Sequence, residues 1–291
     1  DRITVLRDGK FVTCRNTCDI NEDDLVEYMT GAKIANQEIY TEAKPLNSEK
    51  VLEVKGLCNQ KVKNISFELH KGEVLGLYGL VGAGRTEVIR SIFGADPFDK
   101  GEIILHGHTV HFRHTGEAIS KGIGLIPENR KTQGLVQILS VWENMTMVAL
   151  DKCKKNTIIN YKMIQENCEQ YKKSLNIKTP SIKTIIQNLS GGNQQKVILA
   201  KWLLRDCDIL LIDEPTQGID VMVKEEIYKI IRGLAEQGKS MIVVSSELDE
   251  LLRICDNIIV MYDGKQIMSS SKENFNPDKI LQVSVTGRNE E

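Results

Sequence analysis

The sequence is poor in aromatic residues, carries almost no net charge and has no long hydrophobic run. Its 291 residues are 5% aromatic and have a formal net charge of −2. No apolar stretch approaches the roughly 18 residues that cross a bilayer. A charge near zero argues against a broad surface for nucleic acid or anionic lipid. We therefore expect no nucleic-acid partner, and we expect any membrane role to come through a partner protein.

The cysteines lack the paired spacing of a metal site or a disulfide framework. Seven of them, an odd number, are scattered over the chain at positions 14, 18, 58, 153, 168, 207 and 255. This usage is typical of reduced, mostly structural thiols in the cytosol. Cys14 and Cys18 are only a weak metal or redox candidate. A hydrophobic content of 41% suffices for a large core, and the length suggests about two units.

The most informative segment joins a glycine-containing turn to a strand that ends in two acids. The turn lies within Leu189–Gln195 and precedes an apolar-periodic helix, whose start is suited to bind an anion such as a phosphate. The strand Ile209–Ile212 is continuously apolar and delivers Asp213 and Glu214 to its C-terminal edge, where open α/β sheets bind ligands. Either piece alone is better explained by a helix cap or a solvated turn. Together, in this order, they favour a nucleotide site.

A second glycine-rich turn has the spacing of a phosphate-binding loop. It follows an apolar strand at Val74–Tyr78 and runs from Gly79 to Thr86, with Arg85 where the G-x-x-x-x-G-K-[ST] pattern has Lys. Glycines let backbone N–H groups approach phosphates, and the Thr86 hydroxyl can ligate Mg²⁺. A strand-to-helix turn of this kind is common by itself. Its place ahead of the other two elements strengthens the prediction.

Taken in order, these elements resemble the ATP-binding domain of the ABC transporter family over roughly residues 51–270. The resemblance implies an α/β P-loop NTPase fold of ABC ATPase type. We expect a mainly parallel sheet core flanked by helices, an antiparallel β subdomain and an inserted helical subdomain. Finer matches are similar to the C-terminal ATPase half of the tandem proteins of monosaccharide importers, and they lie at Gly82–Glu87, Pro127–Lys131, Gly218–Val221 and Ser245–Leu248.

The resemblance implies an ATPase with ATP and Mg²⁺ as its cofactors. It makes Glu214 the catalytic residue that polarises the attacking water, and it assigns the metal to Thr86, Asp213 and Glu128. The resemblance also implies that two such domains clamp ATP head to tail, so that the signature turn of one domain, here Ser190–Gly192, completes the ATP site of the other. The residues expected to face nucleotide are Gly79, Gly82, Ala83, Gly84, Arg85, Thr86, Glu87, Glu128, Ser190, Gly191, Gly192, Gln194 and Ser246.

The beginning of the chain is repeated near its end. Asp1–Val12 and Asp256–Ile267 share six of twelve residues at an offset of 255, which is one domain's length. A chance β-hairpin around an Asp-Gly turn is the alternative. The repeat predicts a fragment of a longer protein, divided into the tail of a preceding ATPase domain (1–31), a linker (32–48), an ATPase domain (49–270, with the helical subdomain at about 135–188) and a C-terminal tail (271–291).

Several departures from the family pattern concern the chain's own site. Arg85 replaces Lys, Glu128 stands where most members carry Gln, and Ser246 stands where the switch His is expected. No aromatic residue lies between Leu57 and Asn64 to stack on adenine. We therefore expect this domain to bind ATP but to hydrolyse it slowly. Its intact signature would support hydrolysis at the first domain's site.

The resemblance also implies partners and a location. The expected partners are the preceding ATPase domain or a second copy, a membrane permease that contacts the helical subdomain and, indirectly, an external sugar-binding protein. The chain would then lie peripherally on the cytoplasmic face of the membrane. A soluble tandem ATPase without a permease and a regulatory module without nucleotide remain alternatives, and nucleosides or autoinducer sugars remain open as cargo. The residues of a plausible permease patch, equally well explained as subdomain core, are Val136, Ile138, Leu139, Val141, Trp142 and Met145.

Overall fold

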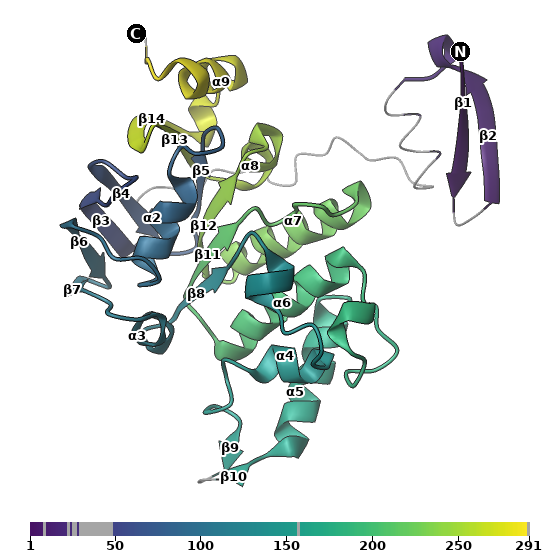
Figure 1. The fold of residues 1–291 in the computed structure, drawn as a ribbon, viewed down its shortest axis with the longest axis horizontal. Helices are drawn as coiled ribbons and strands as arrows, with labels where there is room; N and C mark the ends of the chain where they lie inside the picture. Colours follow the sequence, from purple (N-terminus) through teal and green to yellow (C-terminus); the bar gives the residue numbers. More distant parts are fainter. Residues whose placement is uncertain (8–9, 22–23, 25–27, 29–48, 156–157, 290–291) are drawn as a thin grey trace. The chain divides into compact units, whose positions relative to one another are not determined.

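The computed structural model describes the chain except for residues 8–9, 22–23, 25–27, 29–48, 156–157 and 290–291. The predicted linker, 32–48, lies outside the described residues. The chain divides into two compact units, Asp1–Thr41 and Glu42–Glu291. Figure 1 shows the elements of both units.

The first unit contains a two-stranded antiparallel hairpin. Its strands are β1 (Arg2–Arg7) and β2 (Lys10–Asn16), and a single 3₁₀ turn, η1 (Thr17–Asp19), follows. The side chains of Leu6 and Phe11 are 62% and 65% exposed. Within the described residues of this unit β1 pairs only with β2, and an isolated two-stranded hairpin is marginally stable in water.

The second unit is built on a six-stranded sheet, as the sequence predicts. All neighbouring strands are parallel except the edge strand β14, which pairs antiparallel with β13. The central strands consist almost entirely of buried residues, which is typical of parallel strands covered on both faces. The strand order is β14 (Lys265–Ser271), β13 (Asn257–Tyr262), β5 (Val74–Tyr78), β12 (Ser240–Ser245), β11 (Ile209–Asp213), β8 (Ile123–Ile126).

A four-stranded antiparallel sheet forms the predicted β subdomain. Burial alternates along its edge strand β4, so one face of the sheet covers the core and the other meets solvent. The order of the strands is β4 (Ile65–His70), β3 (Lys50–Cys58), β6 (Lys100–Leu105), β7 (His108–Val110).

Helices from several parts of the chain pack on the six-stranded sheet. The buried face of α2 contains Val88, Ile89 and Ile92, as its apolar spacing predicts. The segment expected as a C-terminal tail forms a 3₁₀ turn, η4 (Lys272–Asn274), and a helix, α9, that packs on β13. The helices are α2 (Arg85–Ile92), α3 (Thr115–Ser120), α7 (Val221–Glu236), α8 (Leu248–Ile254) and α9 (Pro277–Thr286).

A helical lobe gathers around α6 (Gly191–Arg205), and Figure 1 shows it at the opposite end of the unit from α9. Ser140 and Glu143 form a capping box at the start of α4. The lobe comprises a π-helical turn η2 (Arg130–Gly134), α4 (Val141–Thr146), a short hairpin β9 (Lys154–Lys155) and β10 (Ile158–Ile159), α5 (Tyr161–Ser174) and η3 (Ile186–Asn188).

No helix in the described part of the chain is long and apolar enough to cross a membrane.

Candidate functional site

The turn between β5 and α2 forms a backbone cradle. A Cβ atom on Gly79 would overlap the carbonyl oxygen of Met261 on β13, so the close approach of these two segments requires glycine. The amide of Ala83 donates to the carbonyl oxygen of Leu80 over 3.0 Å, which tightens the turn ahead of the helix. Successive N–H groups at such a turn, followed by a helix N-terminus, are suited to bind phosphate.

A cavity of about 500 Å³ lies beside this cradle. Thr86, Glu87, Glu128 and Asp213 are among the residues that line it. The carboxylate of Glu87 accepts a hydrogen bond from Lys61 Nζ over 2.5 Å, so this predicted nucleotide-facing residue is held by a lysine of the loop after β3. Acidic side chains outnumber basic ones in the lining, which favours a cation on this side of the cradle: the acidic residues are Glu87, Asp96, Asp99, Glu128 and Asp213, and the basic ones are Lys61 and Arg90.

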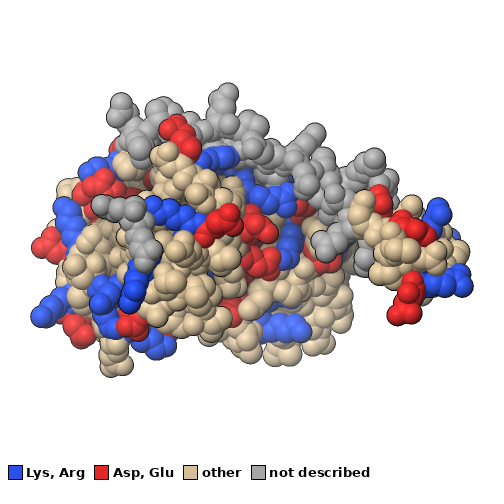
Figure 2. Space-filling view, turned by 90° about the horizontal axis from the view of Figure 1, so that it is seen from above, with Lys and Arg blue, Asp and Glu red and all other residues tan. Residues whose placement is uncertain are grey.

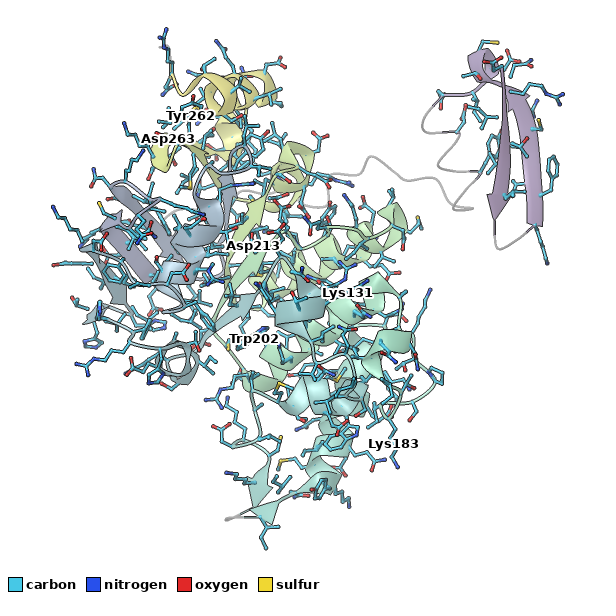
Figure 3. All side chains as sticks on the ribbon, viewed as in Figure 1. Lys131, Lys183, Trp202, Asp213, Tyr262 and Asp263 are labelled. Carbon is cyan, nitrogen blue, oxygen red and sulfur yellow. The ribbon has the colours of Figure 1, made fainter. Side chains whose placement is uncertain are left out.

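Asp213 ends β11 as a buried carboxylate that suits a divalent cation. It is 3% exposed, and its Oδ1 atom makes no hydrogen bond within the described residues; Figure 3 labels it in the interior of the second unit. Burial raises the pKa of Asp213 to about 7, the hydroxyl of Thr86 lowers it by hydrogen bonding, and the charges of Glu128 and Glu214 raise it further. An unpaired carboxylate oxygen beside a hydroxyl is a donor set that fits Mg²⁺.

Glu214 follows in the left-handed backbone region, with φ at +46°, and its amide donates to the carbonyl oxygen of Val244 on β12. Its Oε1 atom lies 3.6 Å from Nη1 of Arg85, and both side chains are largely buried. Burial raises the pKa of Glu214, whereas the Arg85 charge and hydrogen bonds from Ser246 lower it. The guanidinium of Arg85 therefore faces Glu214, the expected catalytic residue. Ser246 lies beside the same carboxylate.

The loop that follows Asp213 and Glu214, the acid pair, contacts the segment that contains Glu128. Oε1 of Glu128 accepts a hydrogen bond from Nε2 of Gln217 over 3.0 Å. Its charge also raises the pKa values of Asp213 and Glu214, so the three carboxylates form one electrostatic group. The structure thus brings together the predicted metal ligands Thr86, Asp213 and Glu128.

The signature turn begins α6. The Oγ atom of Ser190, the N-cap, accepts a hydrogen bond from Nδ2 of Asn193 over 2.9 Å. Gly192 lies directly against Val223 of α7. Gln194 is buried and donates to the carbonyl oxygens of Ile186 and Leu189. It supports the turn from inside the lobe, so the structure does not bring Gln194 to the surface that Ser190 occupies.

Comparison with known proteins identifies the family of this arrangement. The ABC transporter family model matches residues 62–217, more than half of the chain. This chain belongs to the ABC transporter family. A putative ribose/galactose/methyl galactoside import ATP-binding protein of Halalkalibacterium halodurans is 44% identical over 286 residues, covering 98% of this chain and 54% of the relative. A ribose import ATP-binding protein of Clostridium perfringens is 43% identical over 285 residues, covering 98% and 57%.

Solved structures of ABC transporter cassettes share the fold. One, an ATP-binding cassette in its ADP conformation, gives a TM-score of 0.68 at 20% identity and covers 81% of this chain and 95% of its own. A dimeric bacterial ABC transporter cassette gives 0.67 at 22% identity and covers 77% and 100%. The chain spans about half the length of the curated relatives it matches.

The sequence did not predict several residues that lie around the candidate site. Glu250 on α8 is buried and accepts hydrogen bonds from Oγ1 of Thr216 over 3.0 Å and from Oγ of Ser245 over 2.5 Å. It thereby joins the loop after the acid pair to the end of β12. Burial raises the pKa of Glu250 to about 7. The sequence also did not predict Gln217 and Arg130 as site residues. The available signal was that each lies within four residues of a predicted site residue, Glu214 and Glu128 respectively.

Proposed function

We propose that this chain is the C-terminal nucleotide-binding domain of a tandem ATP-binding protein that energises a monosaccharide importer. The domain binds Mg²⁺-ATP at its own cradle, hydrolyses it slowly and supplies Ser190–Gly192 to the site on the preceding domain. The proposal rests on one observation: Nη1 of Arg85 lies 3.6 Å from Oε1 of Glu214. The guanidinium that replaces the lysine of the cradle therefore faces the proposed catalytic residue.

The tandem arrangement is supported by an internal repeat of structure. The strands β1 and β2 correspond to β13 and β14 residue for residue at the offset of 255, and η1 corresponds to η4. Even the irregularity in pairing recurs, between Val5 and Leu6 in one hairpin and between Val260 and Met261 in the other. Leu6 is exposed, whereas Met261, its counterpart, is fully buried. We infer that β1 belongs beside an inner strand of a preceding sheet with β2 at its edge, as β13 lies beside β5 with β14 at the edge.

The chemistry at the local site follows from the positions of the acids. When bound, Mg²⁺ neutralises phosphate charge and orients the γ-phosphoryl group. Thr86 and Asp213 would hold it through the hydroxyl and the unpaired carboxylate oxygen, with Glu128 on the same side. Glu214 would accept a proton from the attacking water. The guanidinium of Arg85 lowers the pKa of that carboxyl, so the carboxylate is a weaker base and hydrolysis here is slow.

The partners follow from the relatives and from the helical lobe. The relatives are import ATP-binding proteins for ribose and galactose-type sugars, so we infer a membrane permease and, indirectly, an external sugar-binding protein. In the lobe, Val141 and Met145 are fully buried, whereas Ile138 is 76% exposed. An apolar groove of about 270 Å³, lined by residues in and next to α4 and α5, is the proposed permease contact; Trp142 of α4 and Met147, which follows α4, are among these residues. The chain would then lie on the cytoplasmic face of the membrane.

The surface charge agrees with a protein partner. Figure 2 shows Lys and Arg interspersed with Asp and Glu over the described residues on the face in view. Together with the net charge of −2, this mixture is unlike the basic stripe of a nucleic-acid-binding protein. Co-purification with a multispanning membrane protein would support the importer, and its failure would favour a tandem ATPase that acts without a permease.

ATPase measurements on the 291-residue chain and on the tandem polypeptide test the proposal. We expect slow turnover by the chain alone, together with measurable Mg²⁺-ATP binding in a calorimetric titration. Rapid turnover by the chain alone, abolished in Glu214→Gln, would overturn the proposed division of roles. Absence of any binding would favour a regulatory module that needs no nucleotide.

A further inference from the structure

The side chain of Arg130 connects three segments of the site that are distant in the sequence. Arg130 begins η2, two residues after Glu128. Its Nη1 donates to the carbonyl oxygen of Gln217 over 2.5 Å, and its Nη2 donates to that of Gly218 over 3.2 Å. Both carbonyls belong to the loop that follows the acid pair. A planar guanidinium can hold two acceptors at once, which a lysine ammonium cannot reproduce with the same geometry.

The same guanidinium lies against the first residue of α6. A Cβ atom on Gly191 would lie 2.6 Å from Nη2 of Arg130 and 3.5 Å from the carbonyl oxygen of Gly218. Glycine at this position therefore leaves the space that the guanidinium fills. The Nε atom of Arg130 is buried and makes no hydrogen bond within the described residues. A partly desolvated cation with an unpaired donor is unfavourable for stability, which favours a functional reason for its position.

The loop held by Arg130 is also held by the local acid site. Gln217 donates through its side chain to Glu128 and accepts through its carbonyl oxygen from Arg130. The loop consequently contacts the metal-facing carboxylates on one side and the signature turn on the other.

We propose that Arg130 is a positioning residue that holds Gln217 and Gly218 against Gly191, so that the signature turn and the loop after the acid pair move as one body. The inference rests on the proposed function, in which the signature turn completes the ATP site of the preceding domain. Through Gln217, the state of this chain's acid site influences the orientation of the turn presented to the other site.

Substitution of Arg130 leaves the rest of η2 anchored. At its other end, the carbonyl oxygen of Gly134 accepts a hydrogen bond from Nζ of the buried Lys201 on α6 over 2.7 Å. We therefore expect Arg130→Ala and Arg130→Lys to fold. Lys131, the exposed next residue, is labelled in Figure 3, and Lys131→Ala is the matched control.

The test measures ATP turnover by the tandem polypeptide with Arg130→Ala, Arg130→Lys, Gly191→Ala and the double variant Arg130→Ala with Gly191→Ala. Each single variant should lower kcat about tenfold, the loss expected when charge-assisted hydrogen bonds are removed. The added methyl group of Gly191→Ala displaces the same guanidinium, so the double variant should be no worse than the poorer single variant. Calorimetric ATP binding by the 291-residue chain should stay unchanged.

Ser190→Arg in the same polypeptide distinguishes a failure of the positioning role of Arg130 from a failure of the proposed role of the signature turn. If Ser190→Arg abolishes turnover while the Arg130 variants keep wild-type kcat, Arg130 has no positioning role and the proposed function stands. Losses that multiply in the double variant would also overturn the inference, because the two residues would then act independently. If Ser190→Arg keeps full turnover, the proposed role of the signature turn fails, and the inference fails with it.

Discussion

Nη1 of Arg85 and Oε1 of Glu214 are 3.6 Å apart in a largely buried setting. The pair joins the position at which the family pattern has a phosphate-binding lysine to the acid expected to activate water. Burial raises the pKa of the Glu214 carboxyl, and the Arg85 charge opposes that shift. In the proposed function, the same contact weakens the cradle as a phosphate site and weakens Glu214 as a base.

Arg85→Lys should tighten ATP binding by the 291-residue chain about tenfold, or about 1.4 kcal/mol. A compact ammonium binds phosphate as a point charge and lacks the planar fork that faces Glu214. Isothermal titration calorimetry with Mg²⁺-ATP checks this. Arg205→Lys is the matched control, since Arg205 pairs with the exposed Asp151 at the far end of α6. Unchanged or weaker binding by Arg85→Lys would contradict the role given to the pair.

Mg²⁺ should stabilise the wild-type chain through Asp213. Binding to the folded state alone raises the free energy of unfolding by on the order of 1–3 kcal/mol at saturating metal. The unpaired Oδ1 atom of Asp213 is the expected ligand. Thermal unfolding with and without Mg²⁺ should show the increase in wild type and its loss in Asp213→Ala. Equal stabilisation of both proteins would place the metal elsewhere.

Much of the fold and part of the site could be predicted from local patterns. The apolar run at Ile209–Ile212 predicts a buried strand that carries Asp213 at its edge, and the spacing from Gly79 to Thr86 predicts the cradle. These signals are local, because strand burial and turn geometry depend on neighbouring residues.

The remaining contacts depend on tertiary packing. Arg130 meets Gly218 from 88 positions away, and Glu250 meets Thr216 from 34. Neither contact leaves a periodic trace in the sequence. The π-helical turn that aims Arg130 is a further feature without a local signal.

Glu250 should make stability depend on pH. Burial raises its pKa to about 7 in the folded chain, above the usual value near 4.3 of an unfolded Glu. The folded state therefore binds more protons between these values, and the free energy of unfolding falls as the pH rises from about 4 to about 7. Glu250→Gln should flatten this part of the dependence, which urea unfolding at pH 5 and pH 8 measures.

The hydroxyl partners of Glu250 give that prediction a control. Glu250→Ala removes the acceptor of the Thr216 hydroxyl and the nearer acceptor of the Ser245 hydroxyl. It should cost about 2–3 kcal/mol of stability at pH 5 and less at pH 8, where ionisation of Glu250 already lowers the stability of the wild type. A Gln variant that destabilises as much as the Ala variant would show that the charge, rather than the hydrogen bonds, holds this cluster together.

Two glycine substitutions should have opposite effects. Gly79→Ala places a methyl group on the carbonyl oxygen of Met261, so the free energy of unfolding should fall by about 1–3 kcal/mol. Gly233 lies within α7 with no atom within 4 Å of an added Cβ, and Gly233→Ala should stabilise the chain by about 0.5–1 kcal/mol. Urea titration measures both. Equal effects would contradict the packing of the cradle turn against β13.

The proposed division of roles between the local acid pair and the signature turn is tested most directly by the ATP turnover of the tandem polypeptide. Two variants of this chain are compared there, Glu214→Gln and Ser190→Arg. Glu214→Gln should leave most of the turnover, because the local site contributes little of it. Ser190→Arg should abolish turnover, because the signature turn serves the other site. Loss of turnover in Glu214→Gln together with normal turnover in Ser190→Arg would contradict the account.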